Sequence, residues 1–351
     1  MITHSKPDIS KRDIEAVARQ IESGILADGD MLLQFEASFS KKIGVRGGVA
    51  TNSGTAALHL ALLSLGVKSG DEVILPGYVC VSPLLAIRYT GATPIIADID
   101  HETGNVSIDD VAEKISPKTK AIIAVHLFGR SAHIDALTSF GVDVIEDCAH
   151  SVGALFNGRP LGSWGRVSVF SFYATKVMTT GHGGMTASED GSILDAVRDL
   201  SSYDGREDGK IRYNYRMTAF QASLGLSQLV RLDHFIERRR TIASYYRDEF
   251  NNHGITLPPQ APEEQNIYYR FIVKARGGAE NLLARLESLG ICAARPIFRP
   301  LTRHTGGDPL PGVERAYSED ISIPIYPALT DREVEKIAKT VVKVFKNEQK
   351  T

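Results

Sequence analysis

The sequence predicts an α/β fold in which a mostly parallel central sheet is flanked by helices and followed by a smaller α+β domain. Three observations support this prediction. Short, continuously apolar segments recur between residues 47 and 172, as expected of strands that are buried on both faces of a parallel sheet. Helical patterns lie between these segments, as connections between parallel strands require. Near residue 240 this alternation stops, and one more strand pattern and two helical patterns follow.

The length of the chain indicates two domains. With 351 residues, the chain exceeds the roughly 250–300 residues at which single hydrophobic cores stop growing. We expect a large domain at residues 1–240, whose N-terminal helices could pack on the small domain. We expect the small α+β domain at residues 241–351.

The predicted elements follow one another in a regular order. Two helical patterns, residues 8–24 and 32–44, come first, and each ends at a glycine. The strand patterns that follow cover residues 47–54, 71–77, 92–100, 120–126, 142–147, 166–172 and 183–188. The segment 55–66 is apolar on nearly all sides, which predicts a buried helix. A long helical stretch occupies residues 218–250.

Composition and charge exclude several classes of protein. The net charge is −2 and the pI is about 6.6, without the basic excess of nucleic-acid-binding proteins. The polar N-terminus does not resemble a signal peptide, and no apolar run reaches the roughly 18 residues of a membrane span. The histidines lack metal-ligand spacing such as HExxH, so we expect no metal site. The three cysteines are far apart, which suggests free thiols in a reducing compartment, and we expect a cytoplasmic protein.

Polar residues gather where the predicted strands end. Open parallel sheets bind ligands at the carboxyl ends of their strands. The residues at these ends are Asn52, Ser53, Gly54, Thr55, Tyr78, Asp98, Asp100, His126, Asp147, His150 and the segment from Ser171 to Lys176. Each alone has a structural explanation as a cap or turn residue, and a lone lysine is usually exposed. Together they predict a ligand site that contains Lys176.

Three of these features match what pyridoxal phosphate (PLP) requires. The segment 52–55 opens a helix and could bind a phosphate, although a plain helix cap has the same sequence pattern. Asp147 follows an apolar strand, where a carboxylate needs a cation or a donor. Lys176, if desolvated, would act as a nucleophile toward a carbonyl. A Rossmann-type dehydrogenase is the competing interpretation, but no predicted strand is followed by GxGxxG.

The order of motifs along the chain resembles the DegT/StrS family of sugar aminotransferases, which are PLP enzymes of the aspartate aminotransferase fold (fold type I). The matching blocks are "GDMLLQFEASF", "NSGTAALHLAL", "GDEVILPGY", "GATPIIADID", "KTKAIIAVHLFG", "VIEDCAHSVGA", "FSFYATK", "TTGHGGM", "NYRMTAFQASLGLSQL" and "IPIYPALTDREVEKI". One block would be weak evidence, whereas the ordered set runs nearly from end to end. The resemblance implies the PLP-dependent transferase fold and a PLP cofactor.

The resemblance also implies roles for residues around the cofactor ring. Lys176 would form the Schiff base and shuttle a proton during catalysis. Asp147 would pair with the pyridine nitrogen and keep the ring an electron sink. His150 would lie near the ring oxygen, where the family usually has glutamine or histidine.

Further residues would hold the cofactor phosphate. Gly54, Thr55 and Ser171 match the family positions that bind the phosphate within one subunit. Asn214 matches a position that reaches the phosphate of the neighbouring subunit, although a turn residue would look the same from one sequence. The resemblance therefore implies a homodimer with shared active sites.

The implied activity is amino transfer from an amino acid, expected to be L-glutamate, to a keto sugar. The acceptor that fits the family best is a nucleotide-linked 3- or 4-keto-deoxysugar of amino-sugar, polysaccharide or natural-product biosynthesis. Three alternatives are an aminotransferase for a cyclitol ketone, a PLP sugar dehydratase of the same family, and a non-catalytic regulator. The dehydratases replace the lysine by histidine, whereas this chain keeps Lys176, and a regulator would have an eroded site.

Two positions depart from the family pattern. After "LPGY" the family commonly has threonine and a bulky aromatic that stacks on the cofactor ring, whereas this chain has Val79 and Cys80. The Cys80 sulfur could lie on the ring face, so we include Cys80 among the cofactor-binding residues. His182 replaces the usual glutamate of "TTGHGG", which either changes the charge beside the site or is a loop variation. Arg295 and Arg299 could meet a nucleotide diphosphate or be solvated surface residues.

Overall fold

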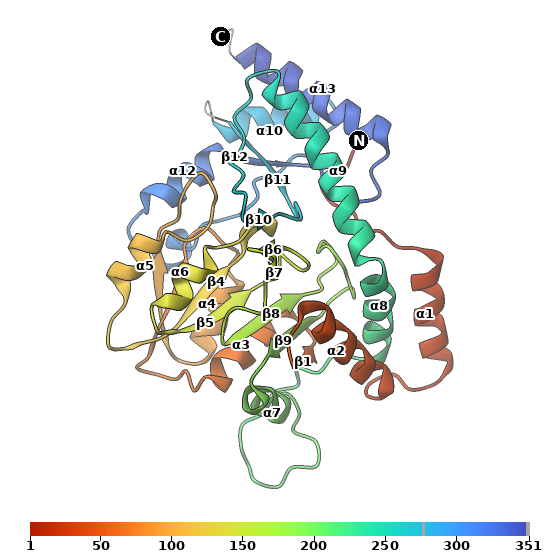
Figure 1. The fold of residues 1–351 in the computed structure, drawn as a ribbon, viewed down its shortest axis with the longest axis vertical. Coiled ribbons are helices and arrows are strands. Elements are labelled where there is room, and N and C mark those ends of the chain that lie inside the picture. Colours follow the sequence, from red (N-terminus) through yellow and green to blue (C-terminus); the bar gives the residue numbers. More distant parts are fainter. Residues whose placement is uncertain (276–277, 349–351) are drawn as a thin grey trace.

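The structure is a computed structural model that describes residues 1–275 and 278–348. Its centre is a seven-stranded sheet with the order β1-β9-β8-β5-β4-β2-β3 (Figure 1). Strands along the row β3-β2-β4-β5-β8 run parallel, and β9 is antiparallel to both of its neighbours. Every strand except β9 therefore points the same way, which confirms the predicted mostly parallel sheet. The strands are β1 (Gly47–Thr51), β2 (Glu72–Pro76), β3 (Thr93–Ala97), β4 (Thr119–Val125), β5 (Asp143–Asp147), β8 (Val167–Ser171) and β9 (Gly184–Ser188).

The two faces of the sheet belong to two separate hydrophobic cores. Successive residues of a strand point to opposite faces, so Val144 and Ile145 enter different cores. The core around Ile145 includes residues of helices α3 (Gly54–Ser64), α4 (Ser82–Tyr89) and α7 (Gly191–Leu200). The core around Val144 includes residues of α2 (Asp30–Ile43), α5 (Ile108–Lys114), α6 (Ile134–Ser139) and α8 (Ala219–Val230). Helices on both faces explain why the strands are apolar throughout.

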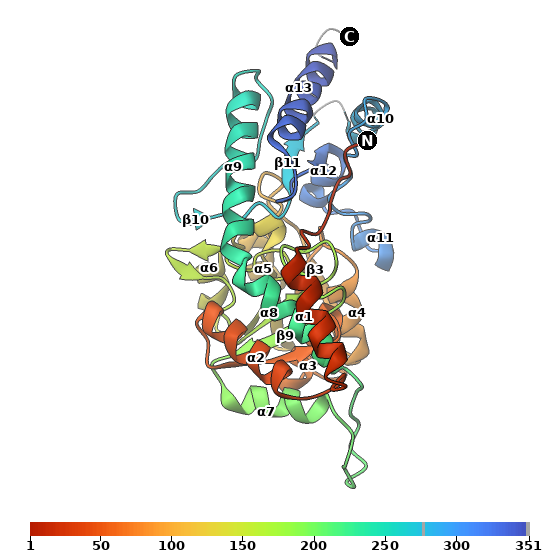
Figure 2. The ribbon, with the colours of Figure 1, turned by 90° about the vertical axis from the view of Figure 1, so that its right-hand side faces the viewer.

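The C-terminal part of the chain forms a third core around a two-stranded antiparallel sheet, β11 (Phe271–Lys274) and β12 (Asp320–Ile323). The helices after β9 and α8 are α9 (Leu232–Asn251), α10 (Ala279–Ser288), α11 (Thr302–Thr305), α12 (Pro311–Glu319) and α13 (Asp331–Glu348). Figure 2 shows α9 extending from the region of the large sheet toward α13. Because α9 contains residue 240, a boundary between domains at that residue would divide a helix, and the two-domain division stays a prediction.

The N-terminal segment contacts both parts of the molecule. Ile2 pairs with Ile291, and the Ile2 N–H donates to the Gly290 carbonyl (2.8 Å) beside the small sheet. In contrast, α1 (Lys11–Glu22) and α2 pack on α8 (Figure 1). The N-terminal helices thus lie with the large sheet, and the residues before them lie with the small sheet.

Several short elements have no counterpart in the sequence prediction. The strands β6 (Leu155–Phe156), β7 (Arg159–Pro160) and β10 (Glu264–Gln265) form a small third sheet, and a 3₁₀ helix, η1 (Leu127–Gly129), follows β4. A strand of two residues has no alternation that a sequence pattern could show. The long helical stretch is two helices, because Arg231 separates the end of α8 at Val230 from the beginning of α9 at Leu232. Within the described part of the chain, no helix is both long and apolar enough to cross a membrane.

We expect Phe39→Ala to lower the free energy of unfolding by about 3–5 kcal/mol, because a large cavity would remain. Phe39 of α2 is fully buried, and its ring lies edge-to-face to Phe170 and Phe172 at centroid distances of 4.8 and 5.2 Å. The control Phe298→Ala removes the same side chain where it is 89% exposed, and should change stability by less than about 0.5 kcal/mol. Urea denaturation of both variants measures the difference. An equal decrease in the free energy of unfolding would contradict the packing of Phe39 in the core.

Candidate active site

The N-terminus of α3 meets the end of β8 at one edge of the large sheet. Gly54 begins α3 beside Ser171, and a Cβ at Gly54 would lie 2.9 Å from the Ser171 Cβ. A larger residue at Gly54 would therefore collide with Ser171. Helix geometry leaves the N–H groups of Gly54 and Thr55 without intrahelical acceptors, while the Ser53 hydroxyl accepts the Ala56 N–H (3.1 Å). The structure thus places Gly54, Thr55 and Ser171 together as a cradle suited to an anion.

The carboxylate of Asp147 is buried at the end of β5 with few partners. The residue is 5% exposed, and its Oδ1 accepts the Ala149 N–H (3.0 Å). Burial raises the pKa of Asp147, while the Ala149 N–H and the charge of Lys176 act in the opposite direction. No ion pair joins Asp147 to another described residue. A cation bound next to this carboxylate would therefore be stabilised.

Lys176 lies in the loop after β8 and faces the ring of Tyr269. Its Nζ is 5.1 Å from the ring centroid, close enough for a cation–π interaction. Burial alone would raise the pKa of Tyr269, but nearby cations, Lys176 foremost, outweigh it and lower the pKa. The Lys176 charge also acts on Asp147, His150 and Cys80. These three predicted site residues therefore lie close enough to Lys176 to interact with its charge.

His150 lies within a row of three rings. Its imidazole stacks on Tyr269 with a centroid distance of 4.2 Å, and on Phe128 at 6.2 Å. Its Nδ1 is buried and has no hydrogen-bond partner among the described residues. Burial, followed by the charges of Lys176 and Arg270, holds the pKa of His150 well below its usual range. The imidazole is therefore neutral near neutral pH and keeps a ring nitrogen available for a ligand.

Cys80 lies in the loop after β2. It is exposed and close enough to Lys176 to interact with its charge. Val79 is buried, and the buried Tyr78 hydroxyl donates to the Ala316 carbonyl (3.3 Å). Protein around the Cys80 thiol raises its pKa through desolvation, while Lys176 acts in the opposite direction. The position of Cys80 is thus compatible with contact to a ligand, whereas Val79 and Tyr78 pack inward.

Asn214 and His182 lie at the exposed margin of this region. The backbone carbonyl of Asn214 accepts a hydrogen bond from the Asn52 side chain (3.0 Å), close to Gly54, and the Asn214 side chain is exposed. The His182 ring lies edge-on to Tyr173, with a centroid distance of 5.1 Å. Asn214 therefore lies near the cradle and presents its side chain outward.

Two carboxylates of the predicted set support the fold instead. The Asp98 carboxylate accepts the N–H groups of Gly312 and Val313 (3.0 and 2.9 Å) at the beginning of α12. The Asp100 carboxylate accepts the Glu102 N–H (2.8 Å) within its own loop. Both residues follow β3 as predicted, but Asp98 holds the beginning of α12 and Asp100 holds its own loop.

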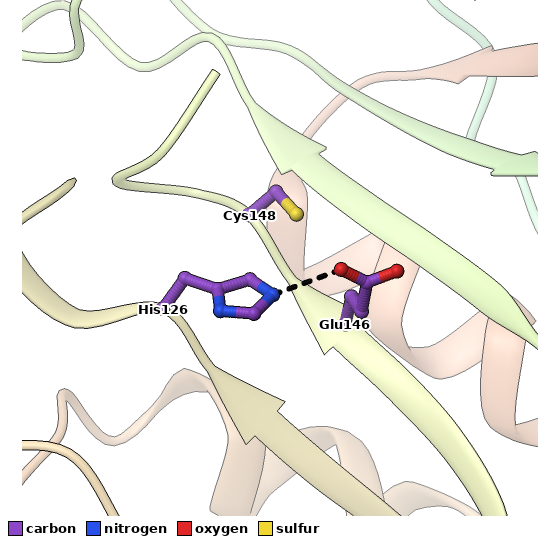
Figure 3. A group of neighbouring side chains, drawn as sticks. All are labelled: His126, Glu146 and Cys148. Carbon is purple, nitrogen blue, oxygen red and sulfur yellow. Dashed lines mark hydrogen bonds and ion pairs between the residues drawn. The ribbon is translucent and has the colours of Figure 1, made fainter. Parts of the chain in front are cut away.

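A second group of titratable side chains is completely buried next to Asp147. Figure 3 shows its members, His126, Glu146 and Cys148. The Ala132 N–H donates to His126 Nδ1 (3.1 Å), so the imidazole proton is on Nε2, which donates to Glu146 Oε2 (2.9 Å). Burial raises the pKa of the Cys148 thiol well above its usual value, so the thiol is protonated. His126 and Glu146 are thus joined by a hydrogen bond, and the Cys148 thiol lies beside them.

The Glu146 carboxylate fixes the loop that follows β5. It accepts the N–H groups of Gly162, Trp164 and Gly165 at 2.8, 2.6 and 2.7 Å, in addition to the His126 bond. Burial would raise the pKa of Glu146, but these donors outweigh it and lower the pKa. Glu146 therefore holds the end of β5, where Asp147 is the next residue, in one position.

The residues that the structure brings together fit pyridoxal phosphate. The cradle at the beginning of α3 suits the phosphate. Asp147 is a buried carboxylate that lacks a cation, as expected of a partner for a protonated ring nitrogen. His150 offers an unpartnered ring nitrogen, and the charge of Lys176 acts on both Asp147 and His150.

Tyr269, Arg270 and Glu146 border this site but were not predicted from the sequence. The Arg270 guanidinium lies 4.7 Å from the Tyr269 ring centroid and donates to the Tyr269 hydroxyl (3.3 Å). Both residues come from the C-terminal part of the chain, at no fixed spacing from Lys176. In the sequence, Glu146 looks like one more residue of a buried strand. A glutamate in such a strand nevertheless indicates that its carboxylate has hydrogen-bond or charge partners.

The chain matches the DegT/DnrJ/EryC1/StrS aminotransferase family over residues 7–342. GDP-perosamine synthase from Escherichia coli O157:H7 is 33% identical over 357 residues, which cover 96% of each protein. The crystal structure of the aminotransferase TlmJ from Streptoalloteichus hindustanus has a TM-score of 0.93 at 32% identity, with 99% of this chain and 100% of that chain covered. The PLP form of Spr1654 from Streptococcus pneumoniae has a TM-score of 0.92 at 27% identity, with 99% of both chains covered.

We expect Glu146→Leu to lower the free energy of unfolding by at least about 3 kcal/mol at neutral pH, because four buried donors would lose their acceptor. The control Glu189→Leu makes the same change at an exposed position, and should cost less than about 0.5 kcal/mol. Because the pKa of Glu146 is lowered in the folded state, its contribution is present above the unfolded pKa of about 4.3 and is lost as the pH falls below that value. Urea denaturation at several pH values tests this, and similar losses for the two variants would contradict the role of Glu146.

Proposed function

The chain belongs to the DegT/DnrJ/EryC1/StrS aminotransferase family, and from that premise we propose that it transfers an amino group from an amino acid to a keto sugar with pyridoxal phosphate as its cofactor. Family membership confirms that the chain is an aminotransferase with the predicted fold. GDP-perosamine synthase and the PLP form of Spr1654 support the sugar substrate and the cofactor. The observation that carries the proposal is the position of Lys176 near the buried Asp147 carboxylate.

The cofactor would be held at its two ends by different groups. The N–H groups of Gly54 and Thr55, with the Ser171 hydroxyl, would bind the phosphate. The Asp147 carboxylate would pair with the protonated ring nitrogen, which supplies the cation that this buried carboxylate lacks. His150 would contact the ring oxygen through its free ring nitrogen. When bound, the cofactor supplies the aldehyde that receives the amino group and a ring that takes up an electron pair from the donor's α-carbon.

The side chain of Lys176 would perform the proton transfers. Its Nζ, once released as a neutral amine, removes a proton from the α-carbon of the amino donor. In the second half-reaction it delivers a proton to the sugar carbon that receives the amino group. Retention of this lysine favours amino transfer over the dehydration carried out by relatives that have histidine there.

We propose L-glutamate as the donor and a nucleotide-linked 3- or 4-keto-deoxysugar as the acceptor. The Leu301 N–H donates to the Gly77 carbonyl (2.9 Å), which places the segment 295–301 beside the loop that carries Cys80. Within this segment, Arg295 pairs with Glu280 and lies over Tyr317, whereas Arg299 donates to the Arg303 carbonyl. Arg299 is thus better placed than Arg295 to meet a diphosphate.

We also propose a homodimer in which Asn214 reaches the phosphate of the partner's cofactor. The exposed Asn214 side chain next to the cradle supports this arrangement. Helix α1 further leaves Ile14 and Ile21 exposed at 63% and 55%, as expected of a surface that a second copy covers.

Two further parts of the prediction remain proposals. The division into domains at residues 1–240 and 241–351 is supported by the separate core around β11 and β12. A cytoplasmic location is supported by the three cysteines, which are unpaired in the structure.

We expect Lys176→Ala to abolish turnover while the protein still binds PLP through the phosphate cradle. Purified wild-type protein with PLP should show the yellow absorbance of a lysine-bound cofactor, and L-glutamate should bleach it. The variant should lack this band or fail to cycle. The control Lys68→Ala, at an exposed lysine far along the chain, should behave as wild type. A colourless wild-type protein that takes up no PLP, or normal turnover by Lys176→Ala, would overturn the proposal.

A further inference from the structure

A cavity of about 490 Å³ lies beside the active site, between α9 and the segment that leads into β11. This volume is within the usual range of small-molecule sites. Its lining includes Phe128, Arg130, Arg240, Arg247, Tyr268 and Arg270, while Lys176, Asp147 and Cys80 do not line it. The cavity is therefore separate from the proposed cofactor site.

The cavity carries an excess of positive charge. Four arginines line it against two carboxylates, Asp248 and Glu264. Arg130 is neutralised by Glu264 through an ion pair of 2.9 Å. Arg240, Arg247 and Arg270 form no ion pair with any carboxylate of the described residues: Arg240 donates to the carbonyls of residues 265 and 266, Arg247 to that of residue 258, and Arg270 to neutral side chains.

One face of α9 supplies much of this polar lining. Arg240, Ser244, Arg247 and Asn251 recur at intervals of three or four residues, so they lie on the same face of the helix, and all four line the cavity. Ser244 and Asn251 are exposed, which leaves a way in from solvent. Burial, followed by the charge of Arg130, acts to lower the pKa of Arg247. The half-buried Arg247 guanidinium forms no ion pair with a described residue and would gain from an anion.

The aromatic side of the cavity is built on unusual backbone conformations. Phe128 and Tyr268 adopt φ values of 60° and 50°, in the left-handed region that non-glycine residues rarely enter. Such conformations persist where the surrounding structure enforces them, frequently at ligand sites. Both residues line the cavity, and their rings provide an apolar surface for the rest of a ligand.

We propose that this cavity is a second binding site, for a small molecule whose phosphate or carboxylate group lies between Arg240 and Arg247. The planar guanidinium groups bind either oxyanion through paired hydrogen bonds. The site goes beyond the proposed amino transfer and does not depend on it. The proposed ligand is a small anionic molecule.

The test uses isothermal titration calorimetry of the full-length protein, saturated with PLP, against pyrophosphate and, separately, against citrate. We expect saturable binding of at least one of them, with one site per chain. Arg247→Gln keeps a donor for the carbonyl of residue 258 and removes the charge, and should weaken binding at least about tenfold. The matched control Arg238→Gln removes an arginine of the same helix that pairs with Asp331 outside the cavity, and should change binding less than about twofold.

A second variant tests the site without removing an existing interaction, so that loss of binding cannot be attributed to a folding defect. Ser244→Glu breaks no hydrogen bond of a described residue and adds a carboxylate between the two arginines at an exposed position. It should abolish binding while urea denaturation gives wild-type stability. Because Ser244 lies outside the phosphate cradle, this variant decides where the anion binds even if the protein takes up no PLP.

The two anions distinguish the ligand classes. Binding of pyrophosphate alone assigns the site to phosphorylated molecules, and binding of citrate alone assigns it to carboxylates; either result supports the site. No binding of either anion at millimolar concentration would overturn the proposal. Equal weakening by Arg247→Gln and Arg238→Gln, or unchanged binding to Ser244→Glu, would also overturn it.

Discussion

The proposed chemistry depends on the different surroundings of two neighbouring carboxylates at the end of β5. Glu146 and Asp147 point to opposite faces of the sheet, as successive strand residues must. Glu146 meets His126 and three backbone N–H groups, and these donors outweigh the effect of burial. Asp147 meets one N–H group, so burial dominates and raises its pKa. The first carboxylate fixes the strand end, and the second stays available for a cation that arrives with a ligand.

The sheet and the edge that carries the site could be predicted from the sequence because both follow from local patterns. Glycine or polar residues mark where an apolar strand pattern ends. Asp147 lies at such an end, and Lys176 lies in the loop that follows another. The reversal of β9 could not be predicted in this way, since a strand has the same alternation in either direction. The partners of Glu146 could not be predicted either, because three of them are backbone N–H groups that any sequence provides.

The C-terminal part was harder to predict for a related physical reason. Tyr269 enters the site from β11 and its flanking residues, and no spacing connects it with Lys176. Its ring position depends on Arg239 of α9, whose guanidinium is buried and donates to the carbonyls of Tyr268, Tyr269 and Ile325 at 3.2, 3.3 and 2.8 Å. An arginine in a polar helical pattern looks like a surface residue, so this support becomes visible only in three dimensions.

Two adjacent residues of α9 connect the active site with the cavity. Arg239 holds the backbone on either side of the Tyr269 ring, and Arg240 faces the cavity while it donates to the carbonyls of residues 265 and 266. The same short segment thus borders both the cavity and the active site. Phe128 connects them a second time, since it lines the cavity and stacks on His150. The backbone between β10 and β11 is therefore held by two adjacent arginines of one helix, with Arg239 supporting Tyr269 on the side of the active site and Arg240 lining the cavity.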